Sequence, residues 1–268
     1  MKDKGKENIL GVCVSAIDYE AAVTKILEAA EQRHPLALSA LAVHGVITGV
    51  LDITHRYRLN QLDLVVPDGQ PVRWALNLLY RVGLTDRVYG PTLMLKVCEQ
   101  AAQRRLPIYL YGSRPAVLEQ LTMNLQERFP DIIIAGTQPS RFRHVSQEEQ
   151  ADIVNEIQAS GAAMVFVGLG CPRQEVWVYE YRSLLAMPLL AVGAAFDFHA
   201  GIVPQAPAWM QQLGLEWFYR FLQEPRRLWR RYVFLNPLYL LLLGLQATGL
   251  RRFDPERVVP PTGELRYG

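Results

Sequence analysis

Short apolar runs alternate with longer segments of helical period between about residues 36 and 200. This alternation is typical of βα units, whose parallel strands are covered on both faces and are therefore apolar throughout. It predicts strands at residues 36–43, 62–66, 108–111, 132–135, 163–167 and 189–192. Helices are predicted between them, including 118–129 and 146–160, where Ser146 and Glu149 fit a capping box. We therefore expect an α/β fold with a doubly wound, mostly parallel sheet.

The pattern changes after Gly201, where the chain becomes rich in Trp, Tyr, Leu and Arg. We therefore divide it into a core at 1–201 and a helical appendage at 202–268. Residues 232–250 carry no charge, but two glycines, Asn236 and Pro237 interrupt them, so a surface helix is favoured over a membrane-spanning one. Five arginines at 220–231 precede this segment and favour an anionic membrane surface; a helix pair buried against a partner subunit is the alternative.

Composition narrows the function and the compartment. The 268 residues include 28 basic and 26 acidic side chains, a net charge of +2, so no overall field favours nucleic acid. The three cysteines have no metal-like spacing and indicate a reducing compartment. The charged N-terminus lacks the apolar stretch of a signal peptide, so we expect a cytoplasmic protein.

Candidate functional residues follow the predicted strands, because ligands of such sheets bind at the carboxyl ends of the strands. Asp68 lies in a Pro-Asp-Gly turn, where it is either an ordinary turn residue or a general base. Arg87 precedes a helix start and suits a phosphate. The other candidates are His44, Gly112, Ser113, Gly136, Gly168, Gly170, Gln174 and Asp197.

A catalytic metal and a dinucleotide are both disfavoured by the motifs. Asp197 and His199 lack a third ligand at suggestive spacing, and the chain has no Asp-x-Asp motif. The glycine turns at Gly112 and Gly168 do not complete Gly-x-Gly-x-x-Gly. We therefore expect no cofactor and no metal.

Six stretches, taken in order, carry a family resemblance: "PDGQPVRWA", "DRVYGPTLM", "YLYGSRPAV", "GLGCPRQEVWV", "VGAAFDFHAG" and "APAWMQQLGLEWFYRFLQEPRRLWRRY". Together they resemble the WecG/TagA/CpsF family of bacterial glycosyltransferases. The resemblance implies a Rossmann-like core with a membrane-docking appendage. It also implies inverting transfer of an N-acetylmannosamine-type sugar from a UDP-sugar to a polyprenyl-diphosphate-linked acceptor. That reaction would take place at the inner membrane face during surface polysaccharide (exopolysaccharide) synthesis.

The resemblance also implies residue roles. Asp68 matches the catalytic base, Arg87 a pocket arginine near the diphosphate, and Gln174 the pocket glutamine. Three arginines fall in the appendage that docks on membrane and acceptor: Arg220, Arg227 and Arg230.

The chain also departs from the family pattern. Ala40 and Ala42 stand where the family usually has Thr-x-Asn, for which Ser39 or His44 could substitute. Gln205 replaces a common arginine, and Pro139-Ser140 a common His-Gly pair. These changes leave the donor and acceptor sugars open.

The expected mechanism uses Asp68 as base, Gln174 to hold the donor, and Arg87 with helix N-termini to receive the charge of departing UDP. His44 is either an auxiliary acid or base or a structural histidine. We expect Glu175 to secure the first turn of its helix and Cys171 to fill a tight turn.

Two other functions compete with sugar transfer. The first is an NAD-dependent nucleotide-sugar epimerase or dehydrogenase, which the missing dinucleotide motif and the missing Tyr-x-x-x-Lys pair disfavour. The second is a non-catalytic membrane scaffold that binds sugar nucleotides. A homo-oligomer remains open.

Overall fold

The computed structural model describes the backbone of residues 1–268 and every side chain except those of Ala208, Arg227, Arg230 and Arg231. A six-stranded parallel sheet forms its centre, with the spatial order β4-β3-β8-β7-β5-β6. Its strands are β3 (Leu36–Leu41), β4 (Leu64–Pro67), β5 (Ile108–Gly112), β6 (Ile134–Gln138), β7 (Met164–Gly168) and β8 (Pro188–Ala191). The predicted α/β class and parallel sheet are confirmed, with strand ends shifted by at most three residues.

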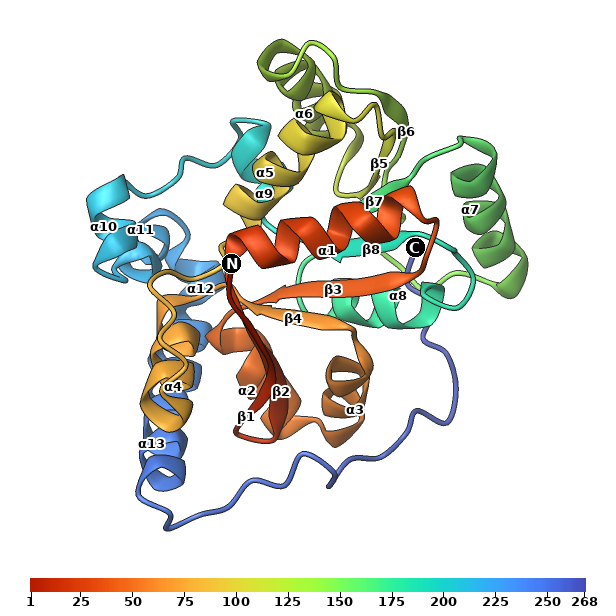
Figure 1. The fold of residues 1–268 in the computed structure, drawn as a ribbon. Helices are drawn as coiled ribbons and strands as arrows, with labels where there is room; N and C mark the ends of the chain where they lie inside the picture. The colour runs from red at the N-terminus through yellow and green to blue at the C-terminus, as the bar shows by residue number, and fades with distance from the viewer.

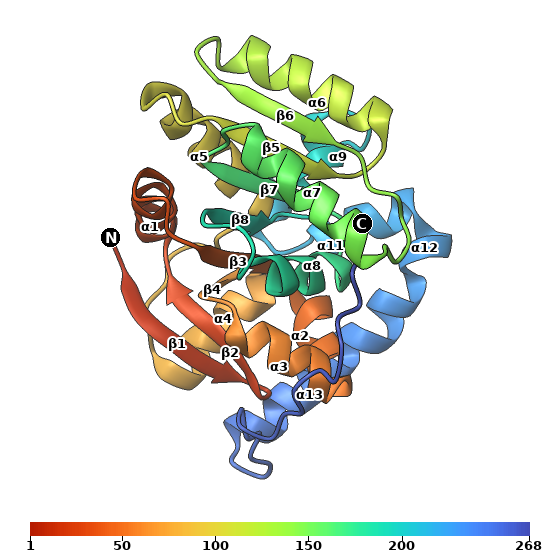
Figure 2. The ribbon, with the colours of Figure 1, turned by 90° about the vertical axis from the view of Figure 1, so that its right-hand side faces the viewer.

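Helices cover both faces of the sheet, as a doubly wound fold requires (Figures 1 and 2). One face is covered by α1 (Tyr19–Glu31), α5 (Gly90–Gln103), α6 (Pro115–Arg128) and α9 (Ala195–His199). The opposite face is covered by α2 (Val43–Leu51), α3 (Ile53–Gln61), α4 (Gln70–Tyr80), α7 (Gln147–Ala159) and α8 (Arg173–Tyr181). The predicted capping box of Ser146 and Glu149 begins α7.

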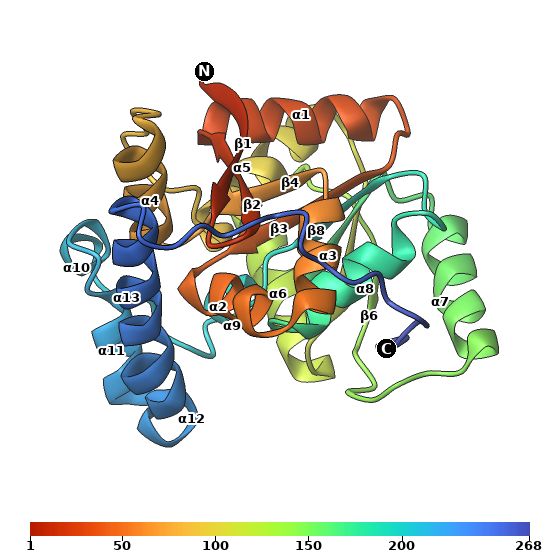
Figure 3. The ribbon, with the colours of Figure 1, turned by 90° about the horizontal axis from the view of Figure 1, so that it is seen from below.

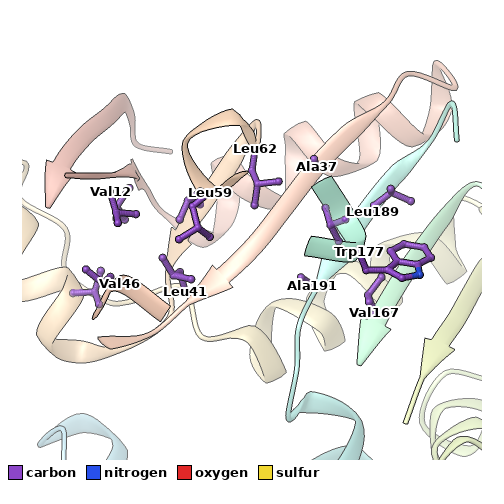
Figure 4. Close-up of a cluster of buried hydrophobic side chains, with 14 of the residues drawn as sticks. Val12, Ala37, Leu41, Val46, Leu59, Leu62, Val167, Trp177, Leu189 and Ala191 are labelled. Carbon is purple, nitrogen blue, oxygen red and sulfur yellow. The ribbon is translucent and has the colours of Figure 1, made fainter. Parts of the chain in front are cut away.

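Alternate residues of each strand enter two separate cores. Val165 and Val167 pack on one side of β7, and Met164 and Phe166 on the other. Figure 4 shows part of the first core, in which Trp177 of α8 lies among residues of β7 and β8. Because both faces are buried, the strands are continuously apolar, which is why the sequence reveals them.

An antiparallel hairpin precedes the sheet and was not predicted. It consists of β1 (Asp3–Ile9) and β2 (Val12–Ile17). The side chain of Ser15 in β2 accepts a hydrogen bond from the Val65 amide of β4, so the hairpin lies along the edge of the sheet. Its first strand is mostly exposed and polar, so it has no apolar pattern to detect.

The C-terminal appendage forms a helical layer beside the open end of the sheet (Figure 3). It contains α10 (Ala208–Gln212), α11 (Glu216–Gln223), α12 (Pro225–Arg230), the π-helical turn η1 (Arg231–Leu235) and α13 (Asn236–Ala247). The Tyr239 hydroxyl of α13 donates to the Pro71 carbonyl at the start of α4. Among the described residues, no helix is both long and apolar enough to cross a membrane.

The last residues return from the appendage to the core. The carboxylate of Glu180 in α8 accepts hydrogen bonds from the backbone amides of Leu265 and Arg266. The Tyr267 ring stacks on the His144 ring with centroids 4.6 Å apart. The tail therefore ties the end of the 202–268 segment back onto the sheet domain.

Candidate active site

A cavity of about 610 Å³ opens where the carboxyl ends of the strands meet the appendage. Residues that follow five strands line it: Ala42, Asp68, Ser113, Gly170 and Gly193. Appendage residues, among them Glu216, Trp217 and Arg220, form the facing wall. The cavity thus lies at the ligand-binding edge that a doubly wound sheet provides.

Asp68 stands at the end of β4 and is held there by backbone contacts. Its amide donates to the Leu41 carbonyl of β3 (3.2 Å), and its Oδ1 accepts from the Gly90 amide at the start of α5 (2.6 Å). A Cβ at Gly90 would lie 3.1 Å from the Ala40 side chain and 3.3 Å from Asp68 Oδ1, so any other residue here would crowd both groups. The carboxylate is therefore fixed, with Oδ2 not engaged by the Gly90 amide.

The surroundings of Asp68 make it a better base than an ordinary aspartate. Burial raises its pKa from 3.8 to about 6, and Glu216 adds to the rise, while Arg87, the Gly90 amide and Arg220 oppose it. Above this pKa the group is ionised and can accept a proton, and its basicity exceeds that of a solvated carboxylate. This is the property that a general base near neutral pH needs.

Among the side chains that the structure describes, four arginines line the cavity: Arg87, Arg114, Arg173 and Arg220. Arg87 is buried, and its guanidinium lies 4.1 Å from the centroid of the Tyr89 ring. The Arg220 guanidinium comes from α11 and lies 5.4 Å from the Phe198 ring centroid. Such a concentration of fixed positive charge suits an anionic ligand with several oxygens, such as a diphosphate.

Glu216 of the appendage forms an ion pair with Arg87. Its Oε2 lies 2.7 Å from Arg87 Nη2, and its Oε1 accepts from the Tyr89 hydroxyl at 2.6 Å. Burial, followed by the charge of Glu216, raises the pKa of Tyr89, so this hydroxyl stays protonated and donates. A carboxylate thus sits in an anion site made by the core, and it joins the appendage to that core.

Gln174 and Glu175 form a buried hydrogen-bonded pair at the start of α8. Gln174 lines the cavity; its Oε1 accepts from the Gly170 amide and its Nε2 donates to Glu175 Oε1. The Ser39 hydroxyl of β3 donates to the same Glu175 oxygen. Glu175 therefore faces inward and holds Gln174, rather than securing the first helical turn as expected.

The structure also places the residues that depart from the family pattern. Ala40, Ala42 and His44 line the cavity, whereas Ser39 is fully buried against Glu175. Of the two substitutes considered for the missing Thr-x-Asn side chains, only His44 reaches the cavity. Its catalytic role stays a prediction.

The remaining candidates divide between the cavity and the sheet. Ser113, Gly168, Gly170 and Asp197 line the cavity. Neither Gly112 nor Gly136 lines the cavity. A Cβ at Gly112 would come within 2.9 Å of the Gly168 backbone, and Gly136 of β6 packs against the ring of Tyr109 of β5.

Two further expectations concern metal and membrane. The His199 ring lies 2.8 Å from the Pro91 carbonyl oxygen, and among the described residues it joins Asp197 in no group of three metal ligands. The side chains of Arg227 and Arg230 lie outside the described residues, so their predicted membrane contacts stay predictions.

Sequence reasoning missed Arg114, Tyr89 and Glu216. Arg114 directly follows Gly112-Ser113 at the end of a strand, so its position was a usable signal. No local sequence signal pointed to Glu216, because its partner Arg87 is 129 residues away in the chain.

Comparison with known proteins gives a family match over nearly the whole chain. The model of the family described as "Glycosyl transferase WecG/TagA/CpsF family" matches residues 7–253. A Bacillus spizizenii N-acetylglucosaminyldiphosphoundecaprenol N-acetyl-beta-D-mannosaminyltransferase is 32% identical over 174 residues, which are 65% of this chain and 65% of that protein. A protein of the same name from Bacillus subtilis is 29% identical over 199 residues, 74% of this chain and 75% of its own length. The matched regions thus span 65% and 75% of the length of these two relatives, less than two thirds in the first case.

Proposed function

The chain belongs to the WecG/TagA/CpsF family of glycosyl transferases, and on that premise we propose that it transfers an N-acetylmannosamine-type sugar from a UDP-sugar. The acceptor would be a polyprenyl-diphosphate-linked sugar, as the names of the two Bacillus relatives indicate for those proteins. One observation carries the proposal: the Asp68 carboxylate, whose pKa burial raises to about 6, lines the same cavity as four arginines of the described part of the chain. A base beside an anion site is what transfer from a nucleoside diphosphate requires.

The proposed reaction is a single inverting displacement. Asp68 accepts the proton of the acceptor hydroxyl, and the hydroxyl oxygen attacks the anomeric carbon of the donor on the face opposite UDP. The new glycosidic bond forms as the bond between sugar and β-phosphate breaks, and the electron pair leaves with UDP. The proton ends on Asp68 and is released to water.

Arg87 and Arg220 would stabilise the charge on the leaving UDP. Both guanidinium groups lower the pKa of Asp68, which places them within electrostatic range of the proposed base. The N-terminus of α6 beyond Ser113 adds backbone amides to the same edge. We propose that this set performs the transfer without a catalytic metal.

Binding of the diphosphate would displace Glu216 from Arg87. A carboxylate and a phosphate compete for the same guanidinium, and two anions cannot share it in a buried site without a large repulsion. Gln174, whose amide can donate and accept, would contact the sugar from the other side of the cavity.

The appendage would bring this site to the lipid substrate at the inner face of the cell membrane. Large apolar side chains are exposed along it, among them Trp209, Leu213, Leu222 and Phe234. Exposed aromatic and aliphatic side chains beside arginines are typical of an element in the headgroup region of an anionic membrane. We propose peripheral attachment there.

An assay of transfer tests the function directly. A panel of UDP-sugars would be offered with a prenyl-diphosphate-linked GlcNAc acceptor, and the lipid-linked disaccharide would be measured by mass spectrometry. We expect product with UDP-N-acetylmannosamine, and transfer that persists in EDTA. Tight binding of NAD, with neither UDP binding nor disaccharide from any donor, would reject the proposal in favour of a dehydrogenase or epimerase.

A further inference from the structure

Three side chains of different chemistry converge at the wall of the cavity: His55 of α3, Cys171 in the turn after β7, which itself lines the cavity, and Glu175 of α8. A ring nitrogen, the Sγ atom and a carboxylate oxygen of these residues lie within 4.8 Å of one another. The helices α3 and α8 pack against each other on the same face of the sheet (Figure 3). None of the three is used as an acid, a base or a nucleophile in the proposed transfer.

Two of these side chains are buried with a polar atom unsatisfied. His55 is 2% exposed and Glu175 is 0% exposed. Among the described residues, His55 Nε2 and Glu175 Oε2 have no hydrogen-bond partner. Buried polar atoms are nearly always hydrogen-bonded, so two unsatisfied atoms in one cluster indicate that a binding partner is missing.

The charge of Glu175 leads to the same conclusion. Its Oε1 accepts from Ser39 and Gln174, both neutral, and no basic side chain among the described residues forms an ion pair with it. A buried carboxylate without a counter-charge is costly, and a cation would remove that cost.

From this juxtaposition we infer that His55, Cys171 and Glu175 form a zinc site. A neutral imidazole, a thiolate and a carboxylate are the ligand types that Zn²⁺ accepts, whereas Mg²⁺ and Ca²⁺ avoid sulfur. For three atoms no more than 4.8 Å apart, one point lies within about 2.8 Å of each, so shifts of at most about 0.5–0.8 Å per ligand atom reach zinc–ligand distances of about 2.0–2.3 Å.

The hydrogen bonds around Glu175 fit this role. Zinc-binding carboxylates and imidazoles are commonly oriented by hydrogen bonds from neighbouring groups. Ser39 and Gln174 hold Oε1 of Glu175, and Oε2 has no hydrogen-bond partner among the described residues. The ion would join α3 to α8 and, through Glu175, fix the Gln174 amide at the cavity. It would act as a structural centre and would not replace Asp68 as base.

Metal analysis of the full chain tests the inference. Protein purified without chelator should contain about one zinc per chain, and the apoprotein should take zinc from a chromogenic chelator. Co²⁺ added to the apoprotein should give a thiolate-to-cobalt charge-transfer band. Cys171→Ser should abolish this band, and His55→Gln should weaken zinc binding at least about tenfold.

Cys13→Ser is the matched control, since Cys13 is also partly buried but lies in β2 of the hairpin. It should keep the cobalt band. Because His55 and Glu175 are buried and their variants could unfold, Zn²⁺ should also raise the melting temperature of the wild-type apoprotein and not that of Cys171→Ser. Apoprotein that fails to compete for zinc, or a cobalt band that survives Cys171→Ser, would overturn the inference.

Discussion

Asp68 at the edge of the sheet is a half-buried carboxylate, and Leu222 on the appendage is an exposed leucine, so each departs from the usual placement of its residue type. Asp68 is a carboxylate whose environment raises its pKa to about 6. Leu222 is a leucine with 63% of its surface exposed. In the core, holding a carboxylate among protein atoms lowers the stability of the fold. In the appendage, apolar side-chain area stays in water. Each placement is costly to folding and is explained by a ligand.

The two regions differ in the kind of ligand that their exposed groups would bind. The sheet edge offers positive charge and a base, so a small anionic substrate completes it. The appendage offers apolar side chains, so a membrane or another apolar surface completes it. Glu216 and Arg220 connect the two, because both come from the appendage and both influence the pKa of Asp68. An enzyme that joins a soluble donor to a lipid acceptor needs such a connection.

The sheet side of this comparison is tested most strongly by Asp68→Asn. The amide cannot accept the proton of the acceptor hydroxyl, so transfer should fall by roughly 100-fold or more. UDP affinity should change little, since the arginines remain. Transfer would be measured as lipid-linked disaccharide, and UDP binding by calorimetry.

The matched control for this substitution is Asp63→Asn, at the opposite end of β4, where Asp63 accepts from the Ala37 amide. It should retain transfer. In the Asp68→Asn protein the side-chain amide oxygen can still accept from the Gly90 amide, so the melting temperature should not drop. Unchanged turnover in that protein would remove Asp68 from its role as base.

The pH dependence of transfer tests whether the buried setting of Asp68 matters. The folded pKa of about 6 lies above the ordinary value of 3.8 because burial disfavours the charged form. The ionised base is therefore lost as the pH falls through about 6, and kcat should drop about tenfold per pH unit below it. A rate that stays constant down to pH 5 would show that the sheet edge does not raise this pKa in the working enzyme.

Much of the sheet side could be predicted from sequence, and the reason is local. Each strand is covered on both faces, so it reads as an apolar run, and Asp68 and Gln174 are conspicuous because they follow such runs directly. The polar strand β1 has no such pattern and was missed. Glycines near strand ends also mark this edge, but the sequence does not show which of them line the cavity. Gly136 was therefore included among the candidates although it does not line the cavity.

Contacts across the chain could not be predicted in this way. The Arg87–Glu216 pair and the Tyr89–Glu216 hydrogen bond join residues 129 and 127 positions apart. The cluster of His55, Cys171 and Glu175 likewise depends on how α3 packs beside α8. No spacing rule brings His55 next to Cys171, so the sequence led to an expectation of no metal.

Glu216→Gln tests the connection between the two regions. A hydrogen bond from a charged donor to a neutral amide is weaker than one to a carboxylate by about 1–1.5 kcal/mol, so the diphosphate should displace glutamine more easily. We expect UDP to bind about tenfold more tightly, measured by calorimetry. Glu224→Gln, at the end of the same helix, is the control and should leave UDP affinity unchanged. Weaker UDP binding in Glu216→Gln would mean that Glu216 organises Arg87 for the donor and does not compete with it.

The smallest effect is expected on the appendage side, from Leu222→Ala. If this leucine inserts part of its side chain into the headgroup region, its truncation should cost about 1 kcal/mol, at about 0.8 kcal/mol per CH₂ group. Sedimentation with vesicles that contain anionic phosphatidylglycerol should then show about fivefold weaker binding. Leu51→Ala is the control, because Leu51 is 67% exposed at the end of α2 in the core. Equal binding of wild type and both variants would place the exposed surface of α11 away from the membrane. That result would contradict the idea that the sheet edge binds an anion while the appendage binds lipid, as far as Leu222 is concerned.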